Sequence, residues 1–436
     1  MPTTKTEPVW KDAEYATIAK RTNRSLIAAF RPSKESEAEQ RGLFLAGERP
    51  VPNFSCPKLE STAYKPTTDE LESLLADWKD DSPLGRIYQR FLGENFLVNV
   101  IADAAKKGDM RLFRRTNQML GYVPDGKLFR SIVADIRRRA EATLDDTAIR
   151  PLANALLDTL PNASEADILL PSEEHVRAAF PAMLALCESL HLPTDVDFDA
   201  VWDAYELARV LQASLDTAGA TGWSVIVTDE QQRISVSRTD KLAKIPVTRK
   251  LHGRDAYAVI AHERLHIERG LRGAASGYYF LQSGTAGYIE GEEGTTLALE
   301  QALKGRANRH AREDYYLAIA AANGFVTNGF MTFEQVHRLM RTYYEFVAEE
   351  PDRERESTES PEEMAWIQTL RTFRGTDCKG NGAYYGKDIV YAKGNLGIWQ
   401  LLIEDPSAAQ TFMVGKFNPM NPDDVRDLTE LGLIAT

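Results

Sequence analysis

The stretch Ala261-His262-Glu263-Arg264-Leu265-His266 carries the pattern H-E-x-x-H, in which two histidines stand four positions apart. Its flanks predict a helix, because Asp255 is a suitable N-cap, apolar residues follow it, and Gly270 is a suitable C-terminal stop. Residues four apart lie on one face of a helix, so both imidazoles can present a nitrogen to a single ion. Glu263 projects beside them, where its carboxylate can take a proton from a water at that ion.

A third ligand is expected on a following helix, and Glu290-Gly291-Glu292-Glu293-Gly294 begins a helical pattern about thirty positions after His262. Acidic residues also suit the first turn of any helix, because they complement its dipole without a metal. Two imidazoles and one carboxylate with an open position are typical of catalytic zinc. The sequence therefore predicts a Zn²⁺ site of His262, His266 and Glu293, with Glu292 as the alternative third ligand.

Composition and charge exclude several classes of protein. The chain has 436 residues, of which 43% are hydrophobic and 27% charged, so it can build a large core and is not a disordered protein. Its net charge of -12 repels phosphate backbones, and no aromatic-interleaved basic stripe is present, so we expect no nucleic-acid partner. The apolar runs are too short for a membrane span, and the first residues lack the apolar segment of a signal peptide. We therefore expect no membrane partner.

Cysteine usage points to a reducing compartment. The chain has three cysteines, Cys56, Cys187 and Cys378, which is an odd number, and they are far apart in the sequence. That argues against a disulfide scaffold and against an all-thiolate zinc site. We therefore expect a cytoplasmic protein.

The pattern along the chain predicts an α+β fold that is mainly α. We expect an N-terminal extension at 1–60, a helical N-terminal region at 61–218, and a zincin-like catalytic domain at 219–436 with a small antiparallel sheet and the H-E-x-x-H helix. Residues 223–227 and 234–237 alternate in polarity around a polar turn, which predicts a β-hairpin. Residues 243–247 contain Pro246, which predicts an edge strand or the start of a strand.

At these residues the sequence resembles the microtubule-associated tyrosine carboxypeptidase family, including its bacterial QEGLA-motif members. The family pattern has a β-hairpin, a helix with H-E-x-x-H, and then text similar to E-E/Q-G-L-A. Here these places hold residues 223–236, His262–His266 and Glu292-Glu293-Gly294-Thr295-Thr296. Some relatives have Gln at the earlier acidic position, which favours Glu293 as the ligand. The resemblance implies a gluzincin-like zinc metallopeptidase, and the Thr-Thr pair departs from the usual Leu-Ala.

Two motifs further along extend the resemblance. Residues 371–376, Arg-Thr-Phe-Arg-Gly-Thr, and residues 387–394, Lys-Asp-Ile-Val-Tyr-Ala-Lys-Gly, are similar to the family's R-x-x-R-G and K-D-x-x-Y-x-x-G segments. A peptidase needs a donor for the oxyanion, and the phenol of Tyr391 can act as one; the alternative is that Tyr391 only packs on its helix.

A carboxypeptidase also needs cations for the terminal carboxylate of its substrate. Arg371, Arg374 and Lys387 are suited to that task. The alternative is that the arginines form structural salt bridges with the acidic run at 349–362. His337, alone on a predicted helix, is more typical of a packing residue than of a site residue.

The resulting hypothesis is a metallopeptidase that removes a C-terminal residue from a peptide or protein. The resemblance implies the carboxypeptidase activity and an aromatic preference. One alternative is a regulatory protein with a non-catalytic metal site, against which the intact Glu263 argues, since a structural zinc needs no base. A second alternative is an endopeptidase on the same metal.

Overall fold

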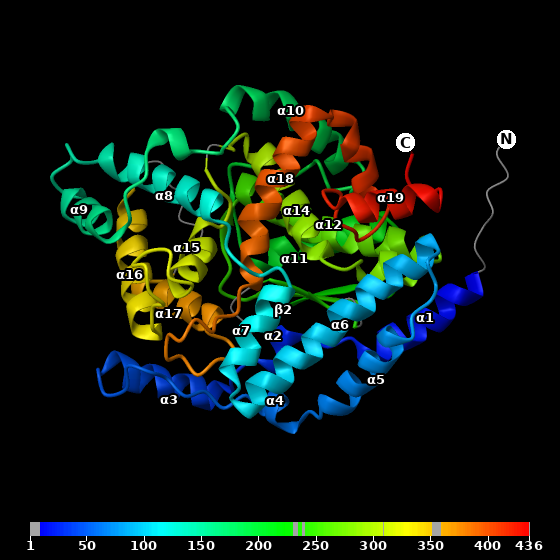
Figure 1. Cartoon of the computed structure of the whole chain (residues 1–436). Helices are drawn as coiled ribbons and strands as arrows, with labels where there is room; N and C mark the ends of the chain where they lie inside the picture. Colours follow the sequence, from blue (N-terminus) through cyan, green and yellow to red (C-terminus); the bar gives the residue numbers. More distant parts are fainter. Residues whose placement is uncertain (1–8, 230–233, 238–239, 308, 351–358, 436) are drawn as a thin grey trace.

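The computed structural model describes residues 9–229, 234–237, 240–307, 309–350 and 359–435. Helices make up most of these residues and the strands are short (Figure 1), which confirms the predicted α+β, mainly α class. None of the described helices is both long and apolar enough to cross a membrane.

The described part of the chain that precedes the larger sheet consists mainly of helices, with one short strand at Val201–Trp202. Its longest helix, α6, begins where the Ser82 hydroxyl accepts a hydrogen bond from the Gly85 amide, and Pro83 occupies its first position. It ends at Gly108, which adopts the left-handed conformation at φ 70° that favours glycine. In Figure 1, α6 runs beside α1 and α5, which pack against it. The bounds are α1 (Val9–Thr22), α2 (Leu26–Ala29), α3 (Lys34–Leu45), α4 (Pro57–Ser61), α5 (Lys65–Ala76), α6 (Pro83–Lys107), α7 (Met110–Met119), α8 (Gly126–Glu141), α9 (Arg150–Thr159), η1 (Glu165–Asp167), α10 (Glu173–Glu188) and α11 (Ala204–Thr217).

The strands form two small sheets. One pairs two short strands antiparallel, and the other has the order β2-β4-β3. The bounds are β1 (Val201–Trp202), β2 (Ser224–Thr228), β3 (Ser235–Ser237), β4 (Leu242–Pro246) and β5 (Leu251–His252).

The larger sheet differs from the prediction in two respects. The two predicted hairpin strands, β2 and β3, do not pair with each other, because each pairs with β4: β2 parallel and β3 antiparallel. The sheet is therefore mixed rather than antiparallel. Ala243 and Ile245 are fully buried, which gives β4 the middle position, and Pro246 is tolerated because it ends the strand. The predicted turn at 230–233 lies outside the described residues.

After β5 the chain is helical again. The helix that carries H-E-x-x-H, α12, packs on α14, and α14 packs on α18; all three lie at the centre of Figure 1. The bounds are α12 (Gly253–Ala275), α13 (Tyr279–Ser283), α14 (Tyr288–Lys304), α15 (Glu313–Ala322), α16 (Phe333–Glu349), α17 (Pro361–Thr372), η2 (Lys387–Ile389), α18 (Val390–Glu404), η3 (Pro406–Met413) and α19 (Pro422–Glu430).

Glycines allow α14 and α18 to approach very closely. A Cβ on Gly294 would lie 2.4 Å from the carbonyl carbon of Gly394, and a Cβ on Gly394 would lie 2.1 Å from the carbonyl oxygen of Glu290. Neither distance is possible between real atoms, so the two backbones touch without side chains between them. This contact holds the first turn of α18 beside the turn of α14 that carries Glu293.

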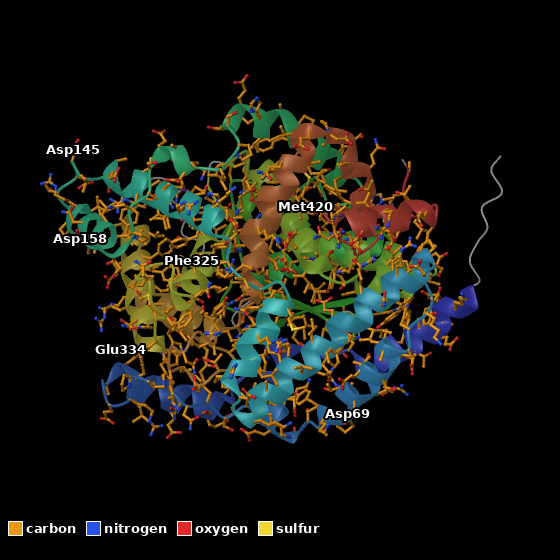
Figure 2. All side chains as sticks on the ribbon, in the orientation of Figure 1. Asp69, Asp145, Asp158, Phe325, Glu334 and Met420 are labelled. Atoms are coloured by element: carbon orange, nitrogen blue, oxygen red, sulfur yellow. The ribbon has the colours of Figure 1, made fainter. Side chains whose placement is uncertain are left out.

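The largest hydrophobic core joins residues from all three predicted parts of the chain. It contains Phe44 from the predicted extension, Ile132 from α8, and Leu339 from α16. The division at residues 60 and 218 stays a prediction, and the described residues on either side of both boundaries share this core. Charged side chains such as Asp69 and Asp145 stand at the outer surface (Figure 2).

Candidate metal centre

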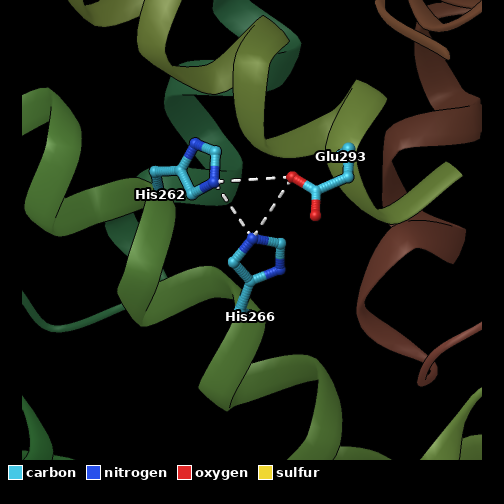
Figure 3. Close-up of side chains that lie close together, drawn as sticks. All are labelled: His262, His266 and Glu293. Atoms are coloured by element: carbon cyan, nitrogen blue, oxygen red, sulfur yellow. Dashed lines mark hydrogen bonds and ion pairs between the residues drawn. The ribbon is translucent and has the colours of Figure 1, made fainter. Parts of the chain in front are cut away.

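The two histidines of H-E-x-x-H lie one turn apart on α12 and face Glu293 on α14 (Figure 3). The Nε2 atoms of His262 and His266 are 3.0 Å apart. One carboxylate oxygen of Glu293, Oε2, lies 3.8 Å from Nε2 of His262 and 3.7 Å from Nε2 of His266. His262, His266 and Glu293 form the metal set, in which one possible ligand atom from each residue lies within 4.8 Å of the others.

Glu292 and Glu293 occupy different places around this set. Glu292 is buried at 3% exposure, and its Oε1 lies 2.9 Å from Nδ1 of His266, on the side of the ring away from Glu293. Lys416 donates to the same carboxylate, and Nη1 of Arg269 lies 2.8 Å from its second oxygen. Burial raises the pKa of Glu292, but the two cations and His266 lower it by more. The pKa therefore lies well below its usual value. Glu292 is therefore a charged partner of His266, and Glu293 is the carboxylate that faces both Nε2 atoms.

His262 has an equivalent partner that the sequence analysis missed. Its Nδ1 lies 2.5 Å from Oε1 of Glu300, two turns along α14 from Glu293. Burial lowers the pKa of His262, but the Glu300 carboxylate outweighs it and raises the pKa to about 9. Burial raises the pKa of Glu300, but His262 and Lys304 outweigh it and lower the pKa to about 2. Glu300 follows Glu293 by seven positions, which is one face of a helix, and that spacing is the signal that could have identified it.

The donor set fits a divalent cation such as zinc. Each imidazole is held through Nδ1 by a carboxylate, which orients Nε2 toward the centre and raises its basicity. Two imidazoles and one carboxylate leave a tetrahedral ion one open position. The pKa of His262 lies above its usual value because the surrounding carboxylates favour positive charge at this point.

Glu263 shares the turn of α12 with the first histidine and is half-buried. Its charge acts on His262, since it contributes to the raised pKa of that ring. Within the described parts of the chain, its carboxylate has no hydrogen bond or ion pair. A carboxylate in this position is available to accept a proton beside the metal set.

Tyr391 lies in the first turn of α18 and close enough to Glu293 for their charges to interact. Burial raises the pKa of the Tyr391 phenol well above its usual value, and the Glu293 and Asp388 carboxylates add to the rise. The phenol therefore stays protonated and can donate. Its ring contacts Tyr315 edge-to-face, with the ring centres 5.4 Å apart.

The three predicted carboxylate-binding cations differ in their surroundings. Arg371 is occupied, because its Nε and Nη2 both lie 2.8 Å from Oδ2 of Asp388. Arg374 is half-buried and its charge lowers the pKa of Asp388. Lys387 has neither a hydrogen bond nor an ion pair with any residue that the structure describes, and the Glu293 charge reaches it. Burial lowers the pKa of Lys387.

His337 lies elsewhere, as expected of a packing residue. Its ring contacts Phe44 edge-to-face at 4.9 Å between centres, inside the core under α3 and α16. No ligand atom of the metal set is among its contacts in the described residues.

Among known proteins, a family model matches the C-terminal part of the chain. The model of the microtubule-associated tyrosine carboxypeptidase family matches residues 352–436. No curated protein matches the chain. Among solved structures, metallocarboxypeptidase 1 of Trypanosoma cruzi aligns with 98% of this chain and 96% of its own, at 11% identity and a TM-score of 0.29, which is too low for an argument about the fold.

The matched segment includes the R-x-x-R-G and K-D-x-x-Y motifs, whereas the histidine helix precedes it. The family model therefore covers the two later motifs of the resemblance, and it does not cover His262, His266 or Glu293. The match to the microtubule-associated tyrosine carboxypeptidase family over residues 352–436 agrees with the resemblance that the sequence motifs carry.

Proposed function

We propose that the chain is a zinc-dependent carboxypeptidase that removes a C-terminal residue from a peptide or protein. The observation that carries the proposal is the convergence of His262, His266 and Glu293, beside Glu263, which has no hydrogen bond or ion pair among the described residues. The family match supports a carboxypeptidase, and the tyrosine named in the family description supports an aromatic preference. All three cysteines are buried free thiols, which supports a reducing compartment such as the cytoplasm.

In the proposed hydrolysis, Glu263 and Tyr391 have separate roles beside the bound metal. A bound zinc supplies Lewis-acid chemistry, since it acidifies water and polarises a carbonyl. Glu263 takes a proton from the attacking water as the new C–O bond forms. The phenol of Tyr391 donates a hydrogen bond to the oxygen that gains negative charge. Glu263 then gives the proton to the amine as the C–N bond breaks, so the products are a free amino acid and a shortened chain.

The substrate's C-terminal carboxylate needs a cation that is not already neutralised. Lys387 meets this condition among the described residues, and Arg374 lies three positions after Arg371, the partner of Asp388. The Asp388 and Glu293 carboxylates raise the pKa of Lys387, against the effect of burial. We assign carboxylate binding to Lys387, with Arg374 in support.

The test separates an enzyme from a non-catalytic metal protein. Glu263→Gln should keep the bound zinc but lower kcat by at least about a hundredfold, because general-base catalysis contributes about 10²–10⁴. Glu174→Gln, an exposed glutamate of α10, is the matched control and should leave both unchanged. Equal turnover in Glu263→Gln and wild type would contradict the proposal.

A second comparison separates exopeptidase from endopeptidase activity. Peptides that differ only in a free or an amidated C-terminus should differ strongly in kcat/KM, because amidation removes the charge that Lys387 binds. Cleavage of both at the same internal bond would instead identify an endopeptidase.

A further inference from the structure

Three side chains lie against the Tyr315 ring, and one of them is Arg312, whose guanidinium is 5.9 Å from the ring centre. Tyr315 lies in the first turn of α15 and is buried at 5% exposure. The Arg371 guanidinium lies over the ring, 4.4 Å from its centre. The Tyr391 ring meets it at 5.4 Å between centres and an interplanar angle of 86°. Both geometries are favourable contacts of an aromatic ring, one with a cation and one edge-to-face.

The same arginine also fixes the backbone that leads to Tyr391. Both Nε and Nη2 of Arg371 bind Oδ2 of Asp388, and the two side chains are only 13% and 4% exposed. Asp388 lies in η2, which continues directly into α18, and Tyr391 follows it by three positions. Arg371 therefore acts on Tyr391 by two routes: through the Tyr315 ring and through the segment that carries Asp388.

These contacts leave Arg371 little capacity for substrate. A guanidinium that is stacked on a ring and bonded to a buried carboxylate would have to break both contacts to capture a peptide terminus. Lys387, one position before Asp388, has no such partners among the described residues. The different surroundings of Arg371 and Lys387 indicate that these two cations have different roles.

We propose that Tyr315 is a positioning residue, clamped by the Arg371–Asp388 ion pair, that fixes the orientation of the Tyr391 ring and its phenol. The inference rests on the proposed function for its catalytic meaning. It assigns Arg371 to positioning rather than to substrate binding, in contrast to the expectation from the sequence. A donor to a developing oxyanion must be held within a fraction of an ångström, and misplacement by about 1 Å can cost about a hundredfold in rate.

The first experiment reads Tyr391 directly and needs no activity. The full chain is prepared with 3-fluorotyrosine, and its ¹⁹F resonances are recorded, with the Tyr391 signal assigned by its loss in Tyr391→Phe. Tyr315→Leu should shift or broaden that signal, whereas Tyr315→Phe, which keeps the ring, should leave it close to its wild-type position. Tyr315→Met fills a similar volume and replaces Tyr315→Leu if the latter does not fold.

Tyr316→Leu is the matched control for this experiment. Tyr316 is the next residue of α15, is also buried, and its hydroxyl donates a hydrogen bond to the backbone carbonyl of Asp125. Its loss should lower thermal stability but leave the Tyr391 signal in place. If Tyr315→Leu moves the signal no more than Tyr316→Leu does, the inference is overturned, whether or not the protein hydrolyses peptides.

The second experiment is a double-mutant cycle on kinetics. Tyr315→Leu should lower kcat by about ten- to a hundredfold, with little change in KM and in zinc content, and Tyr315→Phe should restore most of kcat. In the Tyr391→Phe background, Tyr315→Leu should have no further effect on kcat, because its action passes through Tyr391. Additive losses would overturn the positioning role. An inactive wild type would instead contradict the proposed function, and the ¹⁹F result would still decide the inference.

Discussion

Nδ1 of His262 lies 2.5 Å from Oε1 of Glu300, and the second histidine has a matching partner in Glu292. Both carboxylates come from α14, the helix that also carries Glu293. One face of α14 therefore supplies the proposed third ligand and the carboxylates that orient the other two. This explains why the helix is so acidic at buried positions.

The first prediction concerns Glu300. Glu300→Ala should weaken zinc binding by about ten- to a hundredfold, because the His262 ring loses the carboxylate that fixes its tautomer and direction. Competition with a chromophoric chelator measures the zinc Kd. Glu404→Gln, at an exposed position near the end of α18, is the control and should leave the Kd unchanged. An unaltered Kd in Glu300→Ala would show that the contact does not support the metal.

The second prediction concerns removal of the metal. A cation that binds only the folded chain adds about 2.7 kcal/mol to the free energy of unfolding when its concentration is about 100 times its Kd. Treatment with a zinc chelator should therefore abolish peptidase activity and lower the Tm, and added Zn²⁺ should restore both. The same treatment of Glu293→Gln should give a smaller change in Tm. A Tm that is insensitive to chelation in wild type would contradict a resident cation.

The third prediction concerns the contact of α14 with α18. Gly294→Ala places a methyl group 2.4 Å from the Gly394 carbonyl carbon, so the helices must separate. We expect a loss of about 1–3 kcal/mol in stability from overpacking, together with lower kcat as Tyr391 moves away from Glu293. Gly93→Ala, inside α6 with no atom within 4 Å of the added Cβ, should be neutral or stabilising by up to about 1 kcal/mol. Chemical denaturation of both variants makes the comparison.

The convergence of His262, His266 and Glu293 could be predicted from the sequence because it depends mostly on local information. A helical period alone places His262 and His266 on one face, and one more helix supplies Glu293. The role of Glu292 needed the structure, since adjacent residues on a helix point about 100° apart and the sequence does not say which one faces α12. The partner of Glu292, Lys416, is 124 positions away and carried no signal.

The sheet was predicted less well because strand pairing depends on contacts that are not local in the sequence. Alternating polarity identified the segments of β2, β3 and β4, but strand pairing depends on contacts between segments that the alternation does not specify. The short turn favoured a hairpin between β2 and β3, whereas burial of Ala243 and Ile245 put β4 between them. The sequence left two roles open for Arg371, substrate binding and a structural salt bridge, because its partner Asp388 becomes close only when the chain folds.

The last prediction uses pH and a residue far from the metal set. Burial lowers the pKa of His337 to about 4, and Arg341 and Arg41 add to the decrease, while the Glu362 carboxylate lies 3.3 Å from its Nε2. The ordinary pKa of an unfolded histidine is about 6.5. Between these values the unfolded chain binds the proton and the folded chain does not, so stability must fall as the pH falls from about 6.5 toward 4.

This loss can be isolated by comparing variants at two pH values. Between pH 7.5 and 5.5 the wild type should lose about 1.4 kcal/mol through His337, which corresponds to one unit of the histidine's titration in the unfolded state. His337→Phe, which keeps a ring against Phe44, should lack this part of the pH dependence, whereas His175→Phe at an exposed position of α10 should retain it. Urea unfolding at both pH values gives the difference. The same pH dependence in His337→Phe as in wild type would mean that the folded protein admits the proton, and the buried ring would then be less isolated from water than its contacts indicate.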